Sequence, residues 1–243
     1  MNPRKSEHTN ELGQPIGRPL PGWETRSLPP RTPIVGRRCR IEPLSADAHS
    51  GALHAAYLED RDGSGWTYLP YGPFESADAY SEWVRRAEAQ TDPTFYAIVD
   101  SASDRPVGVA SYLRIAPEMG SIEVGHLRYA PALQQTATST EAMYLMMRRA
   151  FDELGYRRYE WKCDSLNAPS RAAALRLGFQ YEGTFRDAIV YKGRSRDNTW
   201  FSIVAEEWPA LRTAFERWLD PANFGADGSQ HKRLAECIAE AQA

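Results

Sequence analysis

The sequence has few cysteines, no long apolar run and no signal-like N-terminus. Its three cysteines, Cys39, Cys163 and Cys237, lie far apart, so we expect reduced thiols, no disulfide framework and no bound metal. No run of about 18 apolar residues is present to span a membrane. The polar, proline-bearing N-terminus lacks the apolar core of a signal peptide. These absences predict a cytoplasmic protein with no membrane partner.

An excess of basic residues is also missing. Lys and Arg number 29 against 32 Asp and Glu, and the net charge of −3 gives no electrostatic case for a nucleic-acid partner. Hydrophobic residues make up 42% of the chain and charged residues 25%, which is ordinary for a globular protein. A chain of 243 residues can hold one sizeable domain with extensions. We therefore expect one core.

The two ends of the chain differ in composition from the middle. Residues 1–34 are rich in proline and poor in apolar residues, which predicts an extended N-terminal arm without regular structure. Trp23 and Leu28 are the candidates for attaching this arm to the domain. Residues 209–243 predict a C-terminal helical extension outside the core, with an apolar helix face that suits a homodimer contact. The domain itself is expected to span residues 35–208.

The middle of the chain changes its periodicity. Three short runs of β-type residues predict an antiparallel meander, and the helical spacing that follows ends at Gly155. A further β-type run comes after this helix, so it is expected to lie parallel to the third strand. The predicted strands are, in order, residues 95–99, 107–113, 122–129 and 158–163, preceded by a strand at 37–44 and helices at 45–57 and 76–90, and followed by strands at 179–182, 185–192 and 199–204.

The most informative stretch is residues 167–179. Asn167 can cap a helix start, Pro169 fits the first turn, and Gly178 supplies a left-handed stop. A β-type run, a sharply bounded helix and an aromatic strand therefore follow one another closely.

Here the chain resembles the GCN5-related N-acetyltransferase (GNAT) superfamily, whose corresponding segment often reads Asn-x-x-Ser, then an alanine- and leucine-rich helix, Gly-Phe and Glu-Gly. The matching positions in this sequence are Asn167, Ser170, Gly178, Phe179, Glu182 and Gly183. The resemblance is closest to the branch of ribosomal-protein N-terminal (Rim-type) acetyltransferases. It implies an α/β fold whose mixed, mostly antiparallel sheet is splayed between its fourth and fifth strands. It also implies an acetyl-CoA-dependent N-acetyltransferase that transfers acetyl directly, in a ternary complex, to a primary amine on a protein N-terminus or a small molecule.

The resemblance also assigns a site for acetyl-CoA. The diphosphate would bind the loop and helix start formed by Gln134, Gln135, Thr136, Ala137 and Thr138, although the glycines of the usual Arg/Gln-x-x-Gly-x-Gly/Ala pattern are missing. Thr138 and Glu141 also fit a capping box, so a plain well-capped helix is an alternative. Backbone groups of Leu127 and Tyr129, unpaired at the splay, would bind the pantetheine amides. Asn167 and Arg171 would contact the lower arm or the phosphates, or serve only as a cap and a solvated residue.

For the chemistry, the resemblance makes Ser170 the candidate proton donor to the departing thiolate, with an ordinary first-turn serine as the alternative. Glu123 and His126 are the candidate bases, and Asp187 is a weaker third. The odd spacing of Glu123 and His126 predicts that they point to opposite faces of their strand. An aromatic loop is expected to border the acceptor or, alternatively, to cap the core. Its candidate substrate-binding residues are Trp66, Tyr68, Tyr71 and Phe74.

A hypothesis from another class is also compatible with the sequence. The chain could keep the fold and serve as a non-catalytic acyl-CoA-binding or protein-interaction module. The glycine-poor loop at residues 134–138 favours this alternative.

Overall fold

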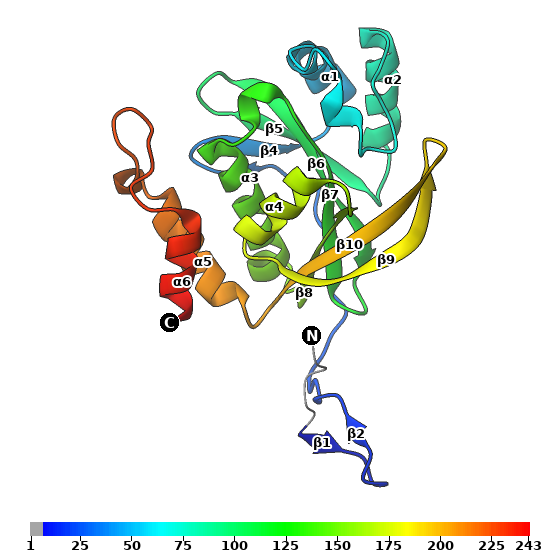
Figure 1. The fold of residues 1–243 in the computed structure, drawn as a ribbon, viewed down its shortest axis with the longest axis vertical. Helices are drawn as coiled ribbons and strands as arrows, with labels where there is room; N and C mark the ends of the chain where they lie inside the picture. Colours follow the sequence, from blue (N-terminus) through cyan, green and yellow to red (C-terminus); the bar gives the residue numbers. More distant parts are fainter. Residues whose placement is uncertain (1–6) are drawn as a thin grey trace.

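A computed structural model describes residues 7–243, which form an eight-stranded mixed sheet with helices on both faces (Figure 1). The strand order is β3-β4-β5-β6-β7-β8-β10-β9. In chain order the sheet consists of β3 (Ile34–Val35), β4 (Cys39–Pro43), β5 (Thr94–Asp100), β6 (Arg105–Ala116), β7 (Ser121–Tyr129), β8 (Arg158–Asp164), β9 (Gln180–Tyr191) and β10 (Arg194–Val204). The helices are α1 (Ala46–Tyr57), α2 (Ala77–Glu88), α3 (Ala137–Arg148), α4 (Ala168–Arg176), α5 (Trp208–Leu219) and α6 (Leu234–Gln242).

The predicted topology is confirmed. Strands β4 to β7 form an antiparallel meander, and β8 joins β7 in parallel after the α3 crossover. The helix runs from α3 into a π-helical turn, η3 (Arg149–Glu153), before Gly155 ends it with a φ of +69°. Two predicted strands, residues 179–182 and 185–192, are in fact the single strand β9. The pairing register between β9 and β10 shifts at two places, and the two strands remain paired on both sides of each shift.

The two faces of the sheet bury separate clusters. Helices α1 and α2 cover an aromatic cluster that includes Tyr57, Trp66, Tyr80 and Phe95. The larger cluster lies on the other face, beneath α3, α4 and α5. Within residues 7–243, no helix is long and apolar enough to cross a membrane.

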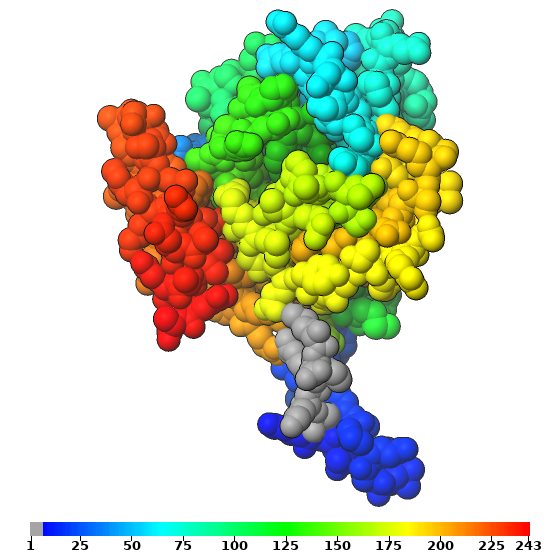
Figure 2. All heavy atoms as spheres, viewed as in Figure 1, coloured from blue at the N-terminus to red at the C-terminus, as the bar shows by residue number. Residues whose placement is uncertain are grey.

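The C-terminal helices belong to the larger cluster. Trp208 and Phe215 of α5 and Leu234 of α6 are buried in it, because α5 presents an apolar face to α3. The expectation that residues 209–243 lie outside the core is therefore wrong. In Figure 2 these helices cover one flank of the molecule.

The N-terminal arm projects away from the domain (Figures 1 and 2). It was expected over residues 1–34, of which residues 1–6 lie outside the described part. Contrary to the expectation of no regular structure, it contains a small hairpin of β1 (His8–Thr9) and β2 (Pro15–Ile16). Trp23 attaches the arm, because its Nε1 donates to the Glu118 carbonyl at 2.9 Å. Leu28 does not, since 61% of its surface is exposed.

Candidate functional site

The sheet splays between β7 and β8, as expected. Their parallel pairing runs from Ser121 opposite Arg158 to Val124 opposite Trp161 and then stops. The rest of β7, including Leu127 and Tyr129, has no partner on β8. The Tyr129 carbonyl is already occupied, since it accepts from Arg128 Nη1 at 2.6 Å and from Gln134 Nε2 at 3.2 Å. The backbone of Leu127 therefore lies beside the splay, whereas the Tyr129 carbonyl is satisfied within the protein.

A β-bulge lies at the start of the splay. Across the β6–β7 ladder, Ser111 faces Gly125 and Val109 faces Arg128, so β7 contains one extra residue. His126 absorbs it with a φ of +52°, a left-handed conformation in which His is among the more tolerated residues. The bulge reverses the alternation of side chains. His126 consequently lies on the same face as Glu123, and the prediction of opposite faces is wrong.

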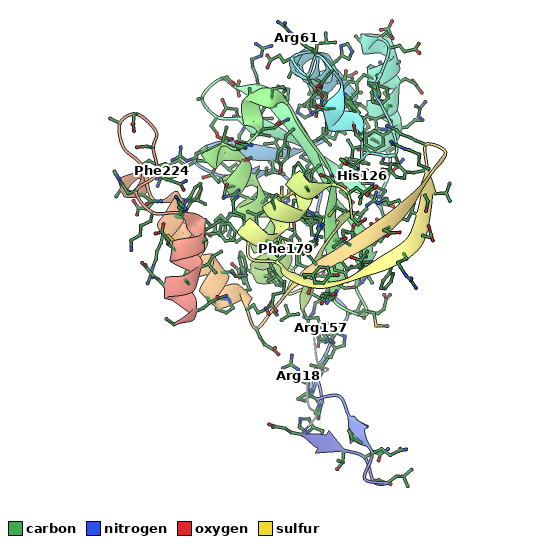
Figure 3. The ribbon with its side chains drawn as sticks, viewed as in Figure 1. Arg18, Arg61, His126, Arg157, Phe179 and Phe224 are labelled. Atoms are coloured by element: carbon green, nitrogen blue, oxygen red, sulfur yellow. The ribbon has the colours of Figure 1, made fainter. Side chains whose placement is uncertain are left out.

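The His126 imidazole is held in aromatic surroundings. Its Nδ1 lies 3.2 Å from the Tyr71 hydroxyl, the two rings stack at 5.6 Å, and the Phe95 ring centre is 5.1 Å away. Figure 3 shows His126 below α1 and α2, inside the curve of the β9–β10 hairpin. Burial, together with the nearby guanidiniums of Arg114 and Arg196, lowers the pKa of His126 to about 4. The imidazole is therefore neutral at pH 7.

Glu123 is enclosed by cations on the same face. Arg114 Nη1 lies 2.8 Å from Glu123 Oε1, and Lys162 Nζ lies 2.9 Å from Oε2. Lys162 also contacts Glu160 at 2.8 Å and sits 3.5 Å from the centre of the Trp200 ring. Burial raises the pKa of Glu123, although both cations oppose the rise. Only 3% of the Glu123 side chain is exposed, so its charge serves chiefly to hold Arg114 and Lys162.

Replacing His126 is expected to change how stability depends on pH. Between pH 6.5 and about 4 the unfolded chain binds a proton at His126 and the folded chain does not, so acid destabilises the wild type over this window. A His126→Asn variant, which keeps a residue tolerant of positive φ, loses this contribution. Its free energy of unfolding relative to wild type should rise by about 3 kcal/mol from pH 7 to pH 4. Urea unfolding at four pH values measures the difference, and a difference that is constant with pH contradicts the assignment.

Helix α4 starts opposite the open end of β7. Asn167 caps it as predicted, since its Oδ1 accepts from the Ser170 N–H at 3.1 Å. Trp161 Nε1 donates to Ser170 Oγ at 3.0 Å. This bond uses a lone pair of the serine oxygen, so the O–H of Ser170 can still act as a donor. Ser170 also lies beside the thiol of Cys163, whose pKa is raised by burial.

The start of α3 provides N–H groups on the other side of the splay. Thr136 is the N-cap: its Oγ1 accepts from the Ser139 N–H at 3.1 Å. The two N–H groups between them, on Ala137 and Thr138, have no acceptor among the described residues. Gln135 takes a φ of +58°, a conformation that glycine adopts without strain. The loop thus forms a left-handed turn into a helix start even though it lacks glycine.

The alternative of a capping box between Thr138 and Glu141 is wrong. Because the helix begins at Ala137, Thr138 is already helical. Glu141 is instead buried under the β3–β4 turn, where its carboxylate accepts the N–H groups of Arg37, Arg38 and Cys39. Its role is to attach α3 to the first strands of the sheet.

Two arginines lie on α4, one in its first turn and one at its end. Arg171 is exposed, and its Nη1 donates to the Ser165 carbonyl at 3.2 Å. Arg176, which the sequence analysis missed, donates from Nη2 to Thr140 Oγ1 in the first turn of α3 at 2.9 Å. It therefore brings a positive charge to the helix start. Arg176 lies three residues after Ala173, which packs on the core. This helical spacing could have placed Arg176 on the inward face of α4.

The residues of the aromatic loop differ in their surroundings, since some cap the core and others lie near candidate site residues. Trp66 is buried, and Phe74 and Tyr71 pack against it in the α1–α2 cluster. Tyr71 also reaches His126, so it alone of these three contacts a candidate site residue. Tyr68 is half-buried and donates from its hydroxyl to the Leu166 carbonyl at 3.1 Å.

Two cations of the β9–β10 hairpin fix this loop in place. Lys192 Nζ donates to the carbonyls of Trp66 and Gly72 at 2.9 and 2.7 Å, and Arg194 donates to that of Thr67 at 3.1 Å. Figure 2 shows the loop meeting the hairpin tip. Asp187, the weaker base candidate, is exposed on β9 and accepts from Ser195 Oγ. Within residues 7–243, no three His, Cys, Asp or Glu side chains gather where they could hold a metal ion.

A buried ion pair under the loop was also missed. Arg128 Nη2 lies 2.7 Å from Asp60 Oδ2, with side chains 3% and 9% exposed. The guanidinium lies 4.6 Å from the ring centres of both Tyr57 and Trp66. Asp60 also accepts the Gly65 N–H at 3.0 Å. The pair therefore connects the end of β7 to the aromatic loop.

Comparisons with known proteins agree with the fold. The model of the acetyltransferase (GNAT) domain family matches residues 38–180. The crystal structure of a GCN5-related N-acetyltransferase from Brucella melitensis is 41% identical, with a TM-score of 0.89 over 90% of this chain and 100% of that chain. The uncharacterized N-acetyltransferase YnaD of Bacillus subtilis is 25% identical over 63% of this chain and 88% of that protein. The Microcin C7 self immunity acetyltransferase MccE, solved with acetyl-CoA and AMP, shares the fold, at 19% identity and a TM-score of 0.63 over 73% of this chain and 98% of that chain.

Proposed function

We propose, from the premise that this chain belongs to the acetyltransferase (GNAT) domain family, that it is an N-acetyltransferase transferring acetyl from acetyl-CoA directly to a primary amine. The observation that carries this proposal is the splay after Val124, flanked by the free N–H groups that start α3 and by Ser170 of α4. The resemblance to the Rim-type branch supports an amine on a small molecule or a protein N-terminus.

The residues around the splay fit acetyl-CoA. The start of α3 combines two unbonded N–H groups with the positive end of a helix dipole, which suits a diphosphate. Gln135 supplies the left-handed turn, while Arg171 and Arg176 add positive charge. The β7 backbone around Leu127, without a partner on β8, offers strand-like bonds to the amides of the pantetheine. Acetyl-CoA supplies a thioester activated for attack.

The side chains divide the proton transfers between them. As the amine nitrogen attacks the thioester carbon it becomes positively charged and strongly acidic, so the neutral imidazole of His126 is a sufficient base. We assign His126 this role because Glu123 is buried between Arg114 and Lys162. Ser170 donates its proton to the departing sulfur, held in place by Trp161. His126→Asn then lowers kcat more than it changes the affinity for acetyl-CoA.

Ser170→Ala is expected to slow transfer and spare cofactor binding. The change removes the proton donor but leaves the N–H groups of α3 and the Asn167 cap intact, since the cap uses the Ser170 backbone. We expect kcat to fall about 100-fold, the lower range for general acid catalysis, with the Kd for acetyl-CoA unchanged. Stopped-flow thiol release under single-turnover conditions measures the chemical step. An unchanged single-turnover rate means that water or another group protonates the sulfur.

The alternative of a non-catalytic acyl-CoA-binding module rested on the missing glycines. Because Gln135 adopts the left-handed conformation that glycine would supply, the loop gives this alternative less support than its sequence does. The two functions separate in one experiment, in which purified protein is mixed with acetyl-CoA and a panel of primary amines. An enzyme releases CoA thiol only when an amine is present, and mass spectrometry detects the N-acetyl product. A binding module holds acetyl-CoA and releases no thiol.

A further inference from the structure

A small pocket lies between the β9–β10 hairpin and residues of β6 and β8. Its volume is about 220 Å³, smaller than the pockets that hold drug-sized ligands, so it could accept only a small molecule. Arg114 and Lys162 provide cationic lining, while Phe185, Ile189 and Trp200 provide apolar lining. The pocket is thus amphipathic, with its positive charge on the strands beside Glu123.

Arg196 of β10 adds another cation beside this pocket. Its Nη2 donates to Asn198 Oδ1, a pocket residue, at 2.8 Å. Its Nε is buried and has no acceptor, and among residues 7–243 no carboxylate lies within ion-pair distance of its guanidinium. The neighbouring Asp197 instead accepts the Asp187 N–H, and Asp164 on the adjacent strand accepts from Tyr191. Arg196 is half-buried and its guanidinium packs over the Tyr191 ring at 5.6 Å. Without a carboxylate partner among the described residues, the guanidinium can bind an anionic group on a ligand.

The charges facing the pocket do not balance. Glu123 is shared between Arg114 and Lys162, and Glu160 is shared between Lys162 and Arg158. Neither carboxylate reaches Arg196. Arg114 lines the pocket, and Arg196 bonds to Asn198, which also lines it, so both guanidiniums border the same pocket.

We propose that the acceptor is a small amine that also carries a carboxylate, and that Arg196 binds this carboxylate together with Arg114. The proposal rests on the acetyl transfer proposed above, since it names the acceptor class for the same site. A guanidinium can bind a carboxylate through two parallel, charge-assisted hydrogen bonds, which fixes orientation as well as position. The apolar wall of Phe185 and Trp200 then accommodates the carbon chain between the two charged groups.

This arrangement also assists the reaction. Nearby cations disfavour the ammonium form of the acceptor, so they raise the fraction of neutral amine that can attack. The nitrogen lone pair forms the new C–N bond, the C–S bond breaks, His126 takes the amine proton, and the sulfur leaves with a proton from Ser170. Exchange with solvent then removes the proton from His126 and returns one to Ser170, so both side chains regain their starting state. Holding the carboxylate keeps the amine aligned with His126 during these steps.

The test compares matched acceptors. The acids are glycine, β-alanine, γ-aminobutyrate and leucine, each measured beside its amide and beside the amine that lacks the carboxylate. In the wild type we expect kcat/KM to be at least about tenfold higher for the best acid than for its matched partners. Arg196→Gln is expected to lower kcat/KM for that acid about 30-fold or more, with little change for the amides or in the KM for acetyl-CoA. Arg186→Gln, an exposed arginine of β9, is the matched control and should change neither.

A second variant keeps the proposal testable if Arg196→Gln fails to fold. Asn198→Asp keeps Arg196 but gives it an internal carboxylate partner, so it too should lose the preference for acids while keeping the wild-type thermal midpoint. Equal turnover of acids and amides overturns the inference and leaves acetyl transfer standing. Absence of turnover with every acid, in a protein that binds acetyl-CoA, also overturns the inference. Failure to bind acetyl-CoA at all overturns the proposed function instead.

Discussion

Thr138→Glu is expected to abolish acetyl-CoA binding without unfolding the protein. Thr138 lies in the first turn of α3, and its N–H has no acceptor among the described residues. For a carboxylate and a phosphate charge separated by about 5 Å, repulsion at an effective dielectric constant of about 20 costs about 3 kcal/mol, or more than 100-fold in Kd. A negative charge in the first turn of a helix is favourable, so stability should be unchanged or slightly higher.

The control for this prediction is Thr138→Gln, which has similar size and no charge. Calorimetric titration of both variants with acetyl-CoA gives the ratio of Kd values, and thermal unfolding gives their stability. Similar affinities for the Glu and Gln variants would show that the diphosphate binds elsewhere. The Thr136 cap is untouched in both variants, so loss of capping does not complicate the result.

Asp60→Asn is expected to have the largest effect on stability. It leaves the Arg128 guanidinium buried between Tyr57 and Trp66 without its anionic partner. Burial already lowers the pKa of Arg128 even with Asp60 present. Removing one partner of a buried ion pair typically costs about 3–5 kcal/mol, which corresponds to a fall in Tm of roughly 10 °C for a chain of this size.

A surface pair provides the control. Glu82 contacts Arg86 one turn away on α2, with both side chains more than half exposed, so Glu82→Gln should cost less than about 1 kcal/mol. The double variant Asp60→Asn with Arg128→Met is expected to recover part of the lost stability, because it removes the buried charge. If Asp60→Asn costs no more than Glu82→Gln, the pair does not anchor the aromatic loop.

The elements were predictable where local rules determine them. The Asn167 cap and the stop at Gly178, which has a φ of +90°, are local signals, and both are confirmed. Likewise, a parallel β8 follows from a helical crossover of sufficient length. The start of α3 was misplaced because Thr136 and Thr138 offer equally good caps in sequence. The choice depends on Glu141, which bonds to the β3–β4 turn far away in the chain.

The site was less predictable because it depends on contacts between distant segments. Alternation along β7 is a sound rule until a bulge interrupts it, and the isolated Gly125 beside His126 was the available signal of the bulge. By contrast, Asp60 and Arg128 are 68 positions apart and carry no motif. The sequence cannot show that Arg196 lacks a carboxylate partner within residues 7–243, because this depends on how the β9–β10 hairpin packs against the other strands. The resemblance therefore indicated the chemistry, whereas the structure was needed to relate individual side chains to it.

Titration of the full chain with acetyl-CoA tests the central claim most directly. The splay after Val124, together with the N-terminus of α3, predicts one molecule bound per chain with a Kd in the micromolar range, or about −8 kcal/mol. Absence of heat and of any thermal stabilisation at millimolar acetyl-CoA would contradict the account, because the fold would then be present without the site that we assign to it.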